Sequence, residues 1–134
     1  MTSEKTLTQA ITNYIKFKYT EAIFKVDLSS DQKLTKQQAY RNSQLLGKWS
    51  RGHPDLVLYE ARGGYHGLFI EIKTKKANPF KKNGELKKSE HLERQEEFMR
   101  KLRGRGYYAV FGVGLNECKR IIDEYMAQEA TAKL

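Results

Sequence analysis

The feature that most constrains the fold is a predicted hairpin in the middle of the chain. Residues 55–60 and 67–73 have the composition of two apolar strands, and the turn-forming run Arg62-Gly63-Gly64 lies between them. Antiparallel partners across a hairpin have residue numbers with a constant sum, which is 126 for a turn centred on residue 63. This register predicts that Asp55 faces Glu71 across neighbouring strands, with Cβ atoms about 5 Å apart.

One face of the predicted hairpin is apolar, and the other carries ionisable side chains that could take part in catalysis. Lys73 lies two residues after Glu71, so the two side chains point to the same face of the strand. Two facing carboxylates repel each other unless a proton or a cation lies between them. Divalent ions such as Mg²⁺ take carboxylate, water and phosphate oxygens as ligands, so the hairpin predicts metal-assisted hydrolysis of phosphodiesters. Three residues on the other face are expected in the core: Leu68, Ile70 and Ile72.

A purely structural interpretation of the same residues is available. Glu71 and Lys73 could form a cross-strand pair at the surface, while Asp55 caps the turn that follows Pro54. The surrounding charge favours the functional interpretation, because a site that cleaves phosphodiesters needs a positively charged surface beside it.

Basic residues are concentrated next to the hairpin. The chain has 25 lysines and arginines against 16 acidic residues, a net charge of +9 that indicates a polyanionic partner, nucleic acid first. Residues 73–105 hold twelve of the basic residues and five of the acidic ones. A surface loop at about 75–88 is predicted to bind DNA, unless it is only a solvated surface. Its candidate residues are Lys75, Lys76, Lys81, Lys82, Lys87 and Lys88.

The remaining sequence predicts an α/β fold. Helices are expected at about 4–18, at 35–46 with Thr35 and Gln38 as a capping box, at 89–103 after Ser89, and in a last segment capped by Asn116. Further strands are expected at 21–28 and 107–113, and the tail from Gln128 is expected to fray. This order gives one domain, residues 1–134, built on a mixed four-stranded sheet.

Several classes of protein are excluded by composition. The single cysteine, Cys118, allows neither an intramolecular disulfide nor a cysteine zinc cluster, and it is expected to be a buried, inert thiol. No apolar run approaches the roughly 18 residues of a membrane span, so a cytoplasmic protein is expected. The glycines at 112 and 114 lack the Gly-Lys-Ser/Thr of a phosphate loop, and no nucleotide cofactor is expected.

The hairpin residues carry a resemblance to a known family. Pro54-Asp55, fifteen residues, and then Glu71-Ile72-Lys73 resemble the PD-(D/E)xK nuclease motif. Together with the flanking residues 52–59, 64–74 and 106–110 and with Gln95, the pattern resembles the virus-type replication–repair nuclease (VRR-NUC) domains. The compact, stand-alone versions of phage and prophage are the most similar. The similarity runs from residue 52 to about residue 125.

The resemblance implies a restriction-endonuclease-like core and Mg²⁺- or Mn²⁺-dependent endonucleolytic cleavage of DNA in phage replication, recombination or repair. Some compact members are homodimeric Holliday-junction resolvases, and a dimer is expected because one site cuts one strand. A phage-encoded member would act in the cytoplasm of the bacterial host.

The resemblance also implies residue roles. Asp55 and Glu71 would be metal ligands with the carbonyl of Ile72 as a third, Lys73 would be the catalytic lysine that orients the attacking water, and Gln95 would support the site. Many members add an acid from the first helix, for which Glu4 is the only candidate.

Two further residues have both a functional and a structural interpretation. Gln95 lies on the apolar stripe of its predicted helix, so its amide either bonds a group of the site or reaches solvent at the edge of the stripe. His53 is close enough to Asp55 to contact DNA, although a turn or surface role is its alternative. His66 and His91 are expected to have turn or surface roles, and Trp49 to pack beside the site rather than to stack on DNA.

The leading alternative function is a non-catalytic nucleic-acid-binding protein of the same fold. A small structural RNA-binding protein of ribosomal type is a third interpretation. Both account for the positive charge. Neither explains two acidic residues that face each other towards a polyanion.

Overall fold

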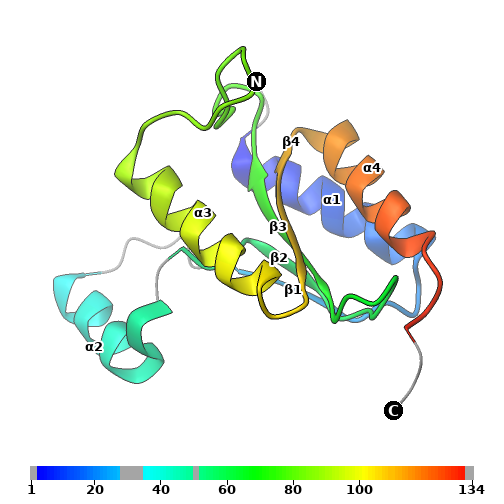
Figure 1. Cartoon of the computed structure of the whole chain (residues 1–134), viewed down its shortest axis with the longest axis horizontal. Coiled ribbons are helices and arrows are strands. Elements are labelled where there is room, and N and C mark those ends of the chain that lie inside the picture. Colours follow the sequence, from blue (N-terminus) through cyan, green and yellow to red (C-terminus); the bar gives the residue numbers. More distant parts are fainter. Residues whose placement is uncertain (1–2, 28–34, 50–51, 132–134) are drawn as a thin grey trace.

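The computed structural model describes residues 3–27, 35–49 and 52–131. Four strands form one sheet in the order β1-β2-β3-β4, in which β1, β2 and β3 are antiparallel and β3 and β4 are parallel. α1 and α4 cover one face of the sheet and α3 the other (Figure 1). This arrangement confirms the predicted α/β class and the mixed four-stranded sheet. The elements are α1 (Glu4–Lys18), β1 (Phe24–Val26), α2 (Lys36–Leu46), the short 3-10 helix η2 (Gly47–Trp49), β2 (Leu56–Leu58), β3 (Leu68–Lys73), α3 (Glu90–Arg103), β4 (Tyr108–Val113) and α4 (Leu115–Met126).

The predicted hairpin register is confirmed. Leu56 pairs with Ile70, and Leu58 pairs with Leu68, so the partner numbers have the constant sum of 126. The turn uses Gly63 and Gly64 with φ angles of +57° and +87°, which glycine adopts without the steric penalty of a Cβ atom.

Successive side chains of β3 point to opposite faces of the sheet and belong to two separate hydrophobic clusters. Leu68, Ile70 and Ile72 are fully buried against α1 and α4, as expected from the sequence. Phe69 points to the opposite face and packs with Met99 of α3. Because successive side chains of a strand point to opposite faces, Glu71 lies on the α3 face together with Phe69.

Close packing of α4 on the sheet depends on Gly112 of β4. A Cβ atom at this position would lie 2.6 Å from Sγ of Cys118 and 2.9 Å from Cγ2 of Ile70. The thiol of Cys118 is buried, as expected from the sequence, and burial raises its pKa to about 12.

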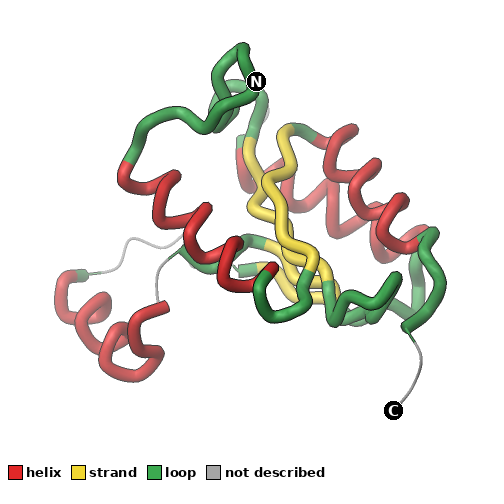
Figure 2. The backbone as a smooth tube through the Cα atoms, in the orientation of Figure 1, coloured by secondary structure: helices red, strands yellow, loops and turns green. Residues whose placement is uncertain are grey.

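α2 stands apart from the sheet layers (Figure 2). Its predicted capping box is present, with the Thr35 hydroxyl accepting from the Gln38 amide and the Gln38 side chain accepting from the Thr35 amide. No α2 residue is buried, and Leu45 is among its exposed apolar side chains.

The loop after β3 is anchored to the domain. Phe80 and Leu86 form an isolated β-bridge, and residues 79–87 are called the basic hairpin below. Pro79 is fully buried, and the ring of Phe80 meets Phe111 edge-on at a centroid distance of 5.6 Å. The anchored apolar residues leave the lysines of the loop exposed.

Three local expectations are wrong. The last helix begins at Leu115 rather than after Asn116, because Gly114 occupies the cap with a φ of +83° that suits glycine. The first strand covers only Phe24–Val26 of the predicted 21–28, of which residue 28 lies outside the described residues. Residues 128–131 do not fray, since the Gly63 amide donates to the Glu129 carbonyl at 2.8 Å and the Thr131 amide to the Ala61 carbonyl at 3.0 Å.

Among the described residues, no helix is long and apolar enough to cross a bilayer.

Candidate active site

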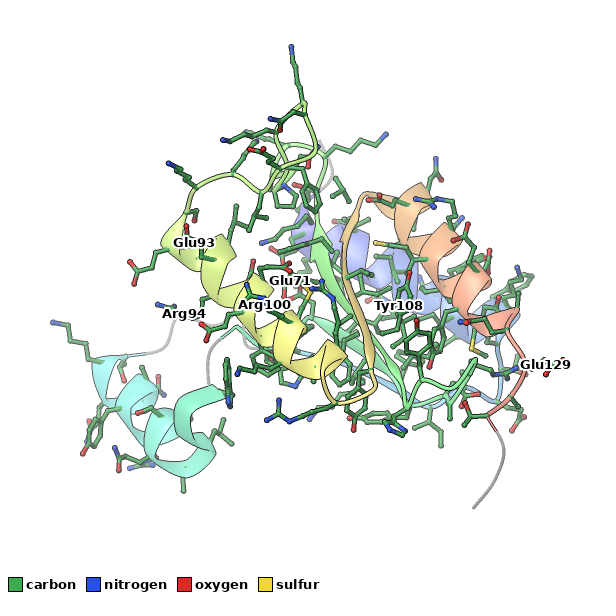
Figure 3. All side chains as sticks on the ribbon, in the orientation of Figure 1. Glu71, Glu93, Arg94, Arg100, Tyr108 and Glu129 are labelled. Atoms are coloured by element: carbon green, nitrogen blue, oxygen red, sulfur yellow. The ribbon has the colours of Figure 1, made fainter. Side chains whose placement is uncertain are left out.

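The site lies where β2 begins and β3 ends. Asp55 directly precedes β2 after the buried Pro54, and Glu71 is in the second half of β3. Figure 3 shows Glu71 at the sheet beside α3, whose outer side carries Arg94 and Arg100. Both carboxyl side chains are buried, with 8% of Asp55 and 3% of Glu71 exposed. Burial of two acids is costly unless they are bonded to other groups, so their partners define what the site can do.

Each carboxyl group accepts a hydrogen bond from an amide. The Ile72 main-chain amide donates to Oδ2 of Asp55 at 2.9 Å, and Nε2 of Gln95 donates to Oε1 of Glu71 at 3.0 Å. Gln95 is itself buried, so the interpretation in which it reaches solvent at the edge of the stripe is wrong. The contact with a group of the site is confirmed, and it ties α3 to β3.

The surface interpretation of the acidic pair is also wrong. Glu71 is buried rather than paired with Lys73 at the surface, and Asp55 bonds an amide of the neighbouring strand. Lys73 is half-buried at the end of β3, and its carbonyl accepts from the Gly114 amide at 2.8 Å. The positive charge of Lys73 lowers the pKa of both carboxyl groups, which places the ammonium beside the pair.

The pKa of both carboxyl groups is raised above its ordinary value. Burial raises the pKa of Glu71 to about 10, and the charge of Asp55 and its hydrogen bond with Glu71 act in the same direction. Burial also raises the pKa of Asp55, although the bonds from Glu71 and from the Ile72 amide oppose this effect. The raised pKa values mean that the pair favours a proton or a cation between its oxygens.

Two buried polar atoms lack a partner among the described residues: Oε2 of Glu71 and Oε1 of Gln95. Buried oxygens without a hydrogen bond are rare in folded proteins and destabilise them. An oxygen-binding cation with its bound waters would satisfy both atoms. The residues present thus fit a hard divalent ion with Asp55 and Glu71 as ligands.

Other acids lie near this pair. Glu4 is the first residue of α1, and its charge raises the pKa of Glu71. The Asp27 amide donates to the Asp55 carbonyl at 2.7 Å, and the Asp27 charge raises the pKa of Asp55. Within the described part of the chain, however, no three acidic, histidine or cysteine side chains are grouped closely enough to form a metal centre by themselves.

The residues predicted to bind nucleic acid lie around the acidic pair rather than within it. His53 is exposed, and its ring meets those of Phe69 and Phe98 edge-on at 6.0 and 5.3 Å. Trp49 packs against Phe98 at 5.4 Å, as expected. The six lysines of the loop are exposed on the segment that follows the last strand residue of the site: Lys75, Lys76, Lys81, Lys82, Lys87 and Lys88.

A solved structure is similar to the whole chain. It is described as a VRR_NUC domain protein, and its superposition gives a TM-score of 0.61 with 25% sequence identity over 100% of this chain and 98% of that one. The chain has the fold of a VRR-NUC domain. The resemblance indicated by the hairpin motif is therefore confirmed at the level of the complete domain. No family model matches the sequence, and no curated protein matches it.

Within the VRR-NUC fold, one residue near the site was expected from the sequence to have only a turn or surface role. His91 lies in the first turn of α3, and the charges of Lys73 and Asp55 both act on its imidazole. The available signal was its spacing from Gln95, because residues four apart lie on the same face of a helix.

Proposed function

We propose that this protein is a metal-dependent endonuclease that hydrolyses DNA phosphodiester bonds. The observation that carries the proposal is the buried pair of Asp55 and Glu71, which has an unpartnered oxygen and lies beside the half-buried Lys73. The similarity to a VRR_NUC domain protein supports it. A protein that only binds DNA gains nothing from two buried acids next to a polyanion, since they repel its phosphates.

The proposed roles follow from the contacts. Asp55, Glu71 and the carbonyl of Ile72 would hold Mg²⁺ or Mn²⁺, which would lower the pKa of water and neutralise charge on the phosphate. The ammonium of Lys73 would orient the attacking water and offset negative charge on the phosphate in the transition state. Gln95 would act through Glu71, because its amide fixes one carboxylate oxygen and leaves the other for the ion.

The DNA surface is proposed to run from His53 across the site to the exposed lysines of the 75–88 loop. We further propose that the substrate is branched DNA and that the active form is a homodimer, with a role in phage recombination or repair in the host cytoplasm. The dimer follows from the chemistry, since one site cuts one strand and resolution of a four-way junction needs two symmetric cuts.

The test is cleavage of linear, nicked, forked and four-way DNA by the purified protein with Mg²⁺, Mn²⁺, Ca²⁺ or EDTA. We expect cleavage with Mg²⁺ or Mn²⁺ and none with EDTA. Asp55→Asn and Glu71→Gln should abolish cleavage while preserving the fold and DNA binding. Undiminished cleavage by Glu71→Gln would contradict the assignment. DNA binding without cleavage under any of these conditions would favour the non-catalytic alternative.

A further inference from the structure

An exposed histidine, His91, lies on α3 next to the acidic pair, and the proposed mechanism gives it no role. His91 is exposed in the first turn of α3, and no hydrogen bond or ion pair joins it to any other described residue. The first turn of α3 is fixed in place, because the Ser89 hydroxyl caps it and accepts from the Leu92 amide at 3.3 Å. The backbone of His91 therefore has a defined position, while its imidazole has no hydrogen-bond partner among the described residues.

The strand and helix spacings place His91 beside Lys73. α3 connects the parallel strands β3 and β4, so it runs antiparallel to β3 (Figure 1). The Gln95–Glu71 hydrogen bond fixes one point of contact between the two elements. Four residues back along the helix is about 6 Å, and two residues further along a strand is about 6.6 Å. His91 is thus level with Lys73 when Gln95 is level with Glu71.

The charges around the imidazole agree with this placement. Burial lowers the pKa of His91, the positive charges of Lys73 and Arg94 lower it further, and only the charge of Asp55 raises it. The imidazole carries a ring N–H that is available to donate in either protonation state. Arg94 is held on the same helix by Glu90, at 3.3 Å, so it leaves the imidazole exposed.

We propose that His91 is a substrate-contacting residue that donates a hydrogen bond to a phosphate oxygen of the cleaved strand, next to the bond that Lys73 acts on. This inference rests on the proposed nuclease function. An exposed donor beside Lys73, on the side from which a polyanion must approach the buried acids, contacts a phosphate as soon as DNA enters the site. This hydrogen bond orders the DNA backbone in the site. His91 therefore positions the scissile phosphate and is not a metal ligand.

The test compares His91→Ala with His66→Ala. His66 is also exposed but lies before the start of β3, at the opposite end of that strand from Lys73. We expect His91→Ala to lower kcat/KM by about 10- to 100-fold, the usual effect of removing a hydrogen bond to a charged group. His91→Asn should recover part of the loss because its amide still donates. His66→Ala should behave as wild type, and all variants should keep the wild-type melting temperature.

A second measurement distinguishes contact with DNA from an indirect effect. Single phosphates of the cleaved strand are replaced in turn by neutral methylphosphonates, and DNA affinity is measured in EDTA for wild type and His91→Ala. We expect one position where the replacement weakens wild type several-fold and leaves His91→Ala unaffected. Identical profiles for the two proteins would overturn the proposal. Because binding in EDTA needs no cleavage, an inactive wild type would overturn the nuclease function and leave this result interpretable.

Discussion

At the residue scale, the side-chain amide of Gln95 determines which oxygen of the Glu71 carboxylate is left to bind a cation. Gln95 donates to Oε1 of Glu71 and leaves Oε2 without a partner, so it sets which oxygen faces the position of a cation. The sequence predicted that the Gln95 amide either bonds a group of the site or reaches solvent, because an amide on an apolar stripe needs a polar partner. It could not predict that the acceptor is Glu71 rather than a metal-bound water, since this choice depends on how α3 crosses β3.

Gln95→Leu should separate positioning of Glu71 from binding of the ion. The leucine keeps the volume of the side chain and removes the donor, so Glu71 loses its fixed orientation. We expect cleavage to fall about 10- to 100-fold, the usual cost of removing a group that supports a metal ligand, and more Mg²⁺ to be needed for half-maximal rate. The measurement is a Mg²⁺ titration of single-turnover cleavage, with Glu93→Gln on the exposed side of α3 as the control. A wild-type titration curve for Gln95→Leu would show that Glu71 needs no support.

At the element scale, the hairpin was the part of the fold that sequence reasoning determined best. Its register follows from where the two glycines lie, and a shift by one residue would turn Lys73 towards the α1 and α4 face and Ile72 towards the α3 face. The end of the chain was predicted poorly, because residues 128–131 are held by main-chain bonds to 61–63 that leave no pattern in the side chains. The cap of α4 was assigned to Asn116 on residue preference, whereas the left-handed backbone at Gly114 determines where the helix begins.

The anchoring of the basic hairpin leads to a prediction about DNA binding. Pro79 and Phe80 hold its base against the domain, so the exposed lysines on the hairpin and directly after it keep a fixed place relative to the site. Each lysine that neutralises a phosphate releases counterions, and the log–log salt dependence of affinity should flatten by roughly 0.9 for every phosphate that is no longer neutralised. Replacing Lys81, Lys82, Lys87 and Lys88 by serine should therefore flatten the slope by about two to three units.

The salt series should be paired with single-turnover cleavage at saturating DNA, which we expect to change little because none of the four lysines contacts the acidic pair. Replacing Lys5, Lys16, Lys25 and Lys119 by serine provides a control with the same change in net charge on other elements. Equal slopes for the hairpin variant and wild type would show that the hairpin is only a solvated surface. The DNA path would then have to run elsewhere, for example along Lys36 and Arg41 of α2.

At the scale of the whole molecule, stability should respond to pH through two acids with opposite shifts. Burial favours a raised pKa for Asp123, but hydrogen bonds from Tyr14, Tyr19 and Lys18 lower it, so its contribution is lost as pH falls through the lowered value. These bonds join α1 to α4 at 2.6 Å for each tyrosine hydroxyl. The pKa of Glu71 is shifted in the opposite direction. Above about pH 5.5 a carboxylate such as Asp123 stays ionised, so changes in stability with pH in that range report on Glu71 and not on Asp123.

Without metal, the folded protein should become less stable as pH rises. Glu71 has a folded pKa of about 10 against an ordinary value of 4.5, so between these values the folded state binds more protons than the unfolded state. The free energy of unfolding therefore falls with rising pH over this interval. Glu71→Gln removes the titrating group and keeps its volume. At pH 8 in EDTA we expect the variant to be about 1–3 kcal/mol more stable than wild type, with a flatter pH profile.

Urea unfolding of both proteins at several pH values, with EDTA and then with Mg²⁺, measures this effect. Mg²⁺ should stabilise wild type at pH 8, because the ion binds only the folded state and replaces the shared proton, and it should stabilise Glu71→Gln far less. Glu93→Gln should follow wild type throughout, since Glu93 is exposed. Parallel pH profiles for wild type and Glu71→Gln would mean that the buried acids share no proton. If Mg²⁺ also failed to stabilise wild type, the buried pair would bind no ion and would no longer support a metal-dependent nuclease.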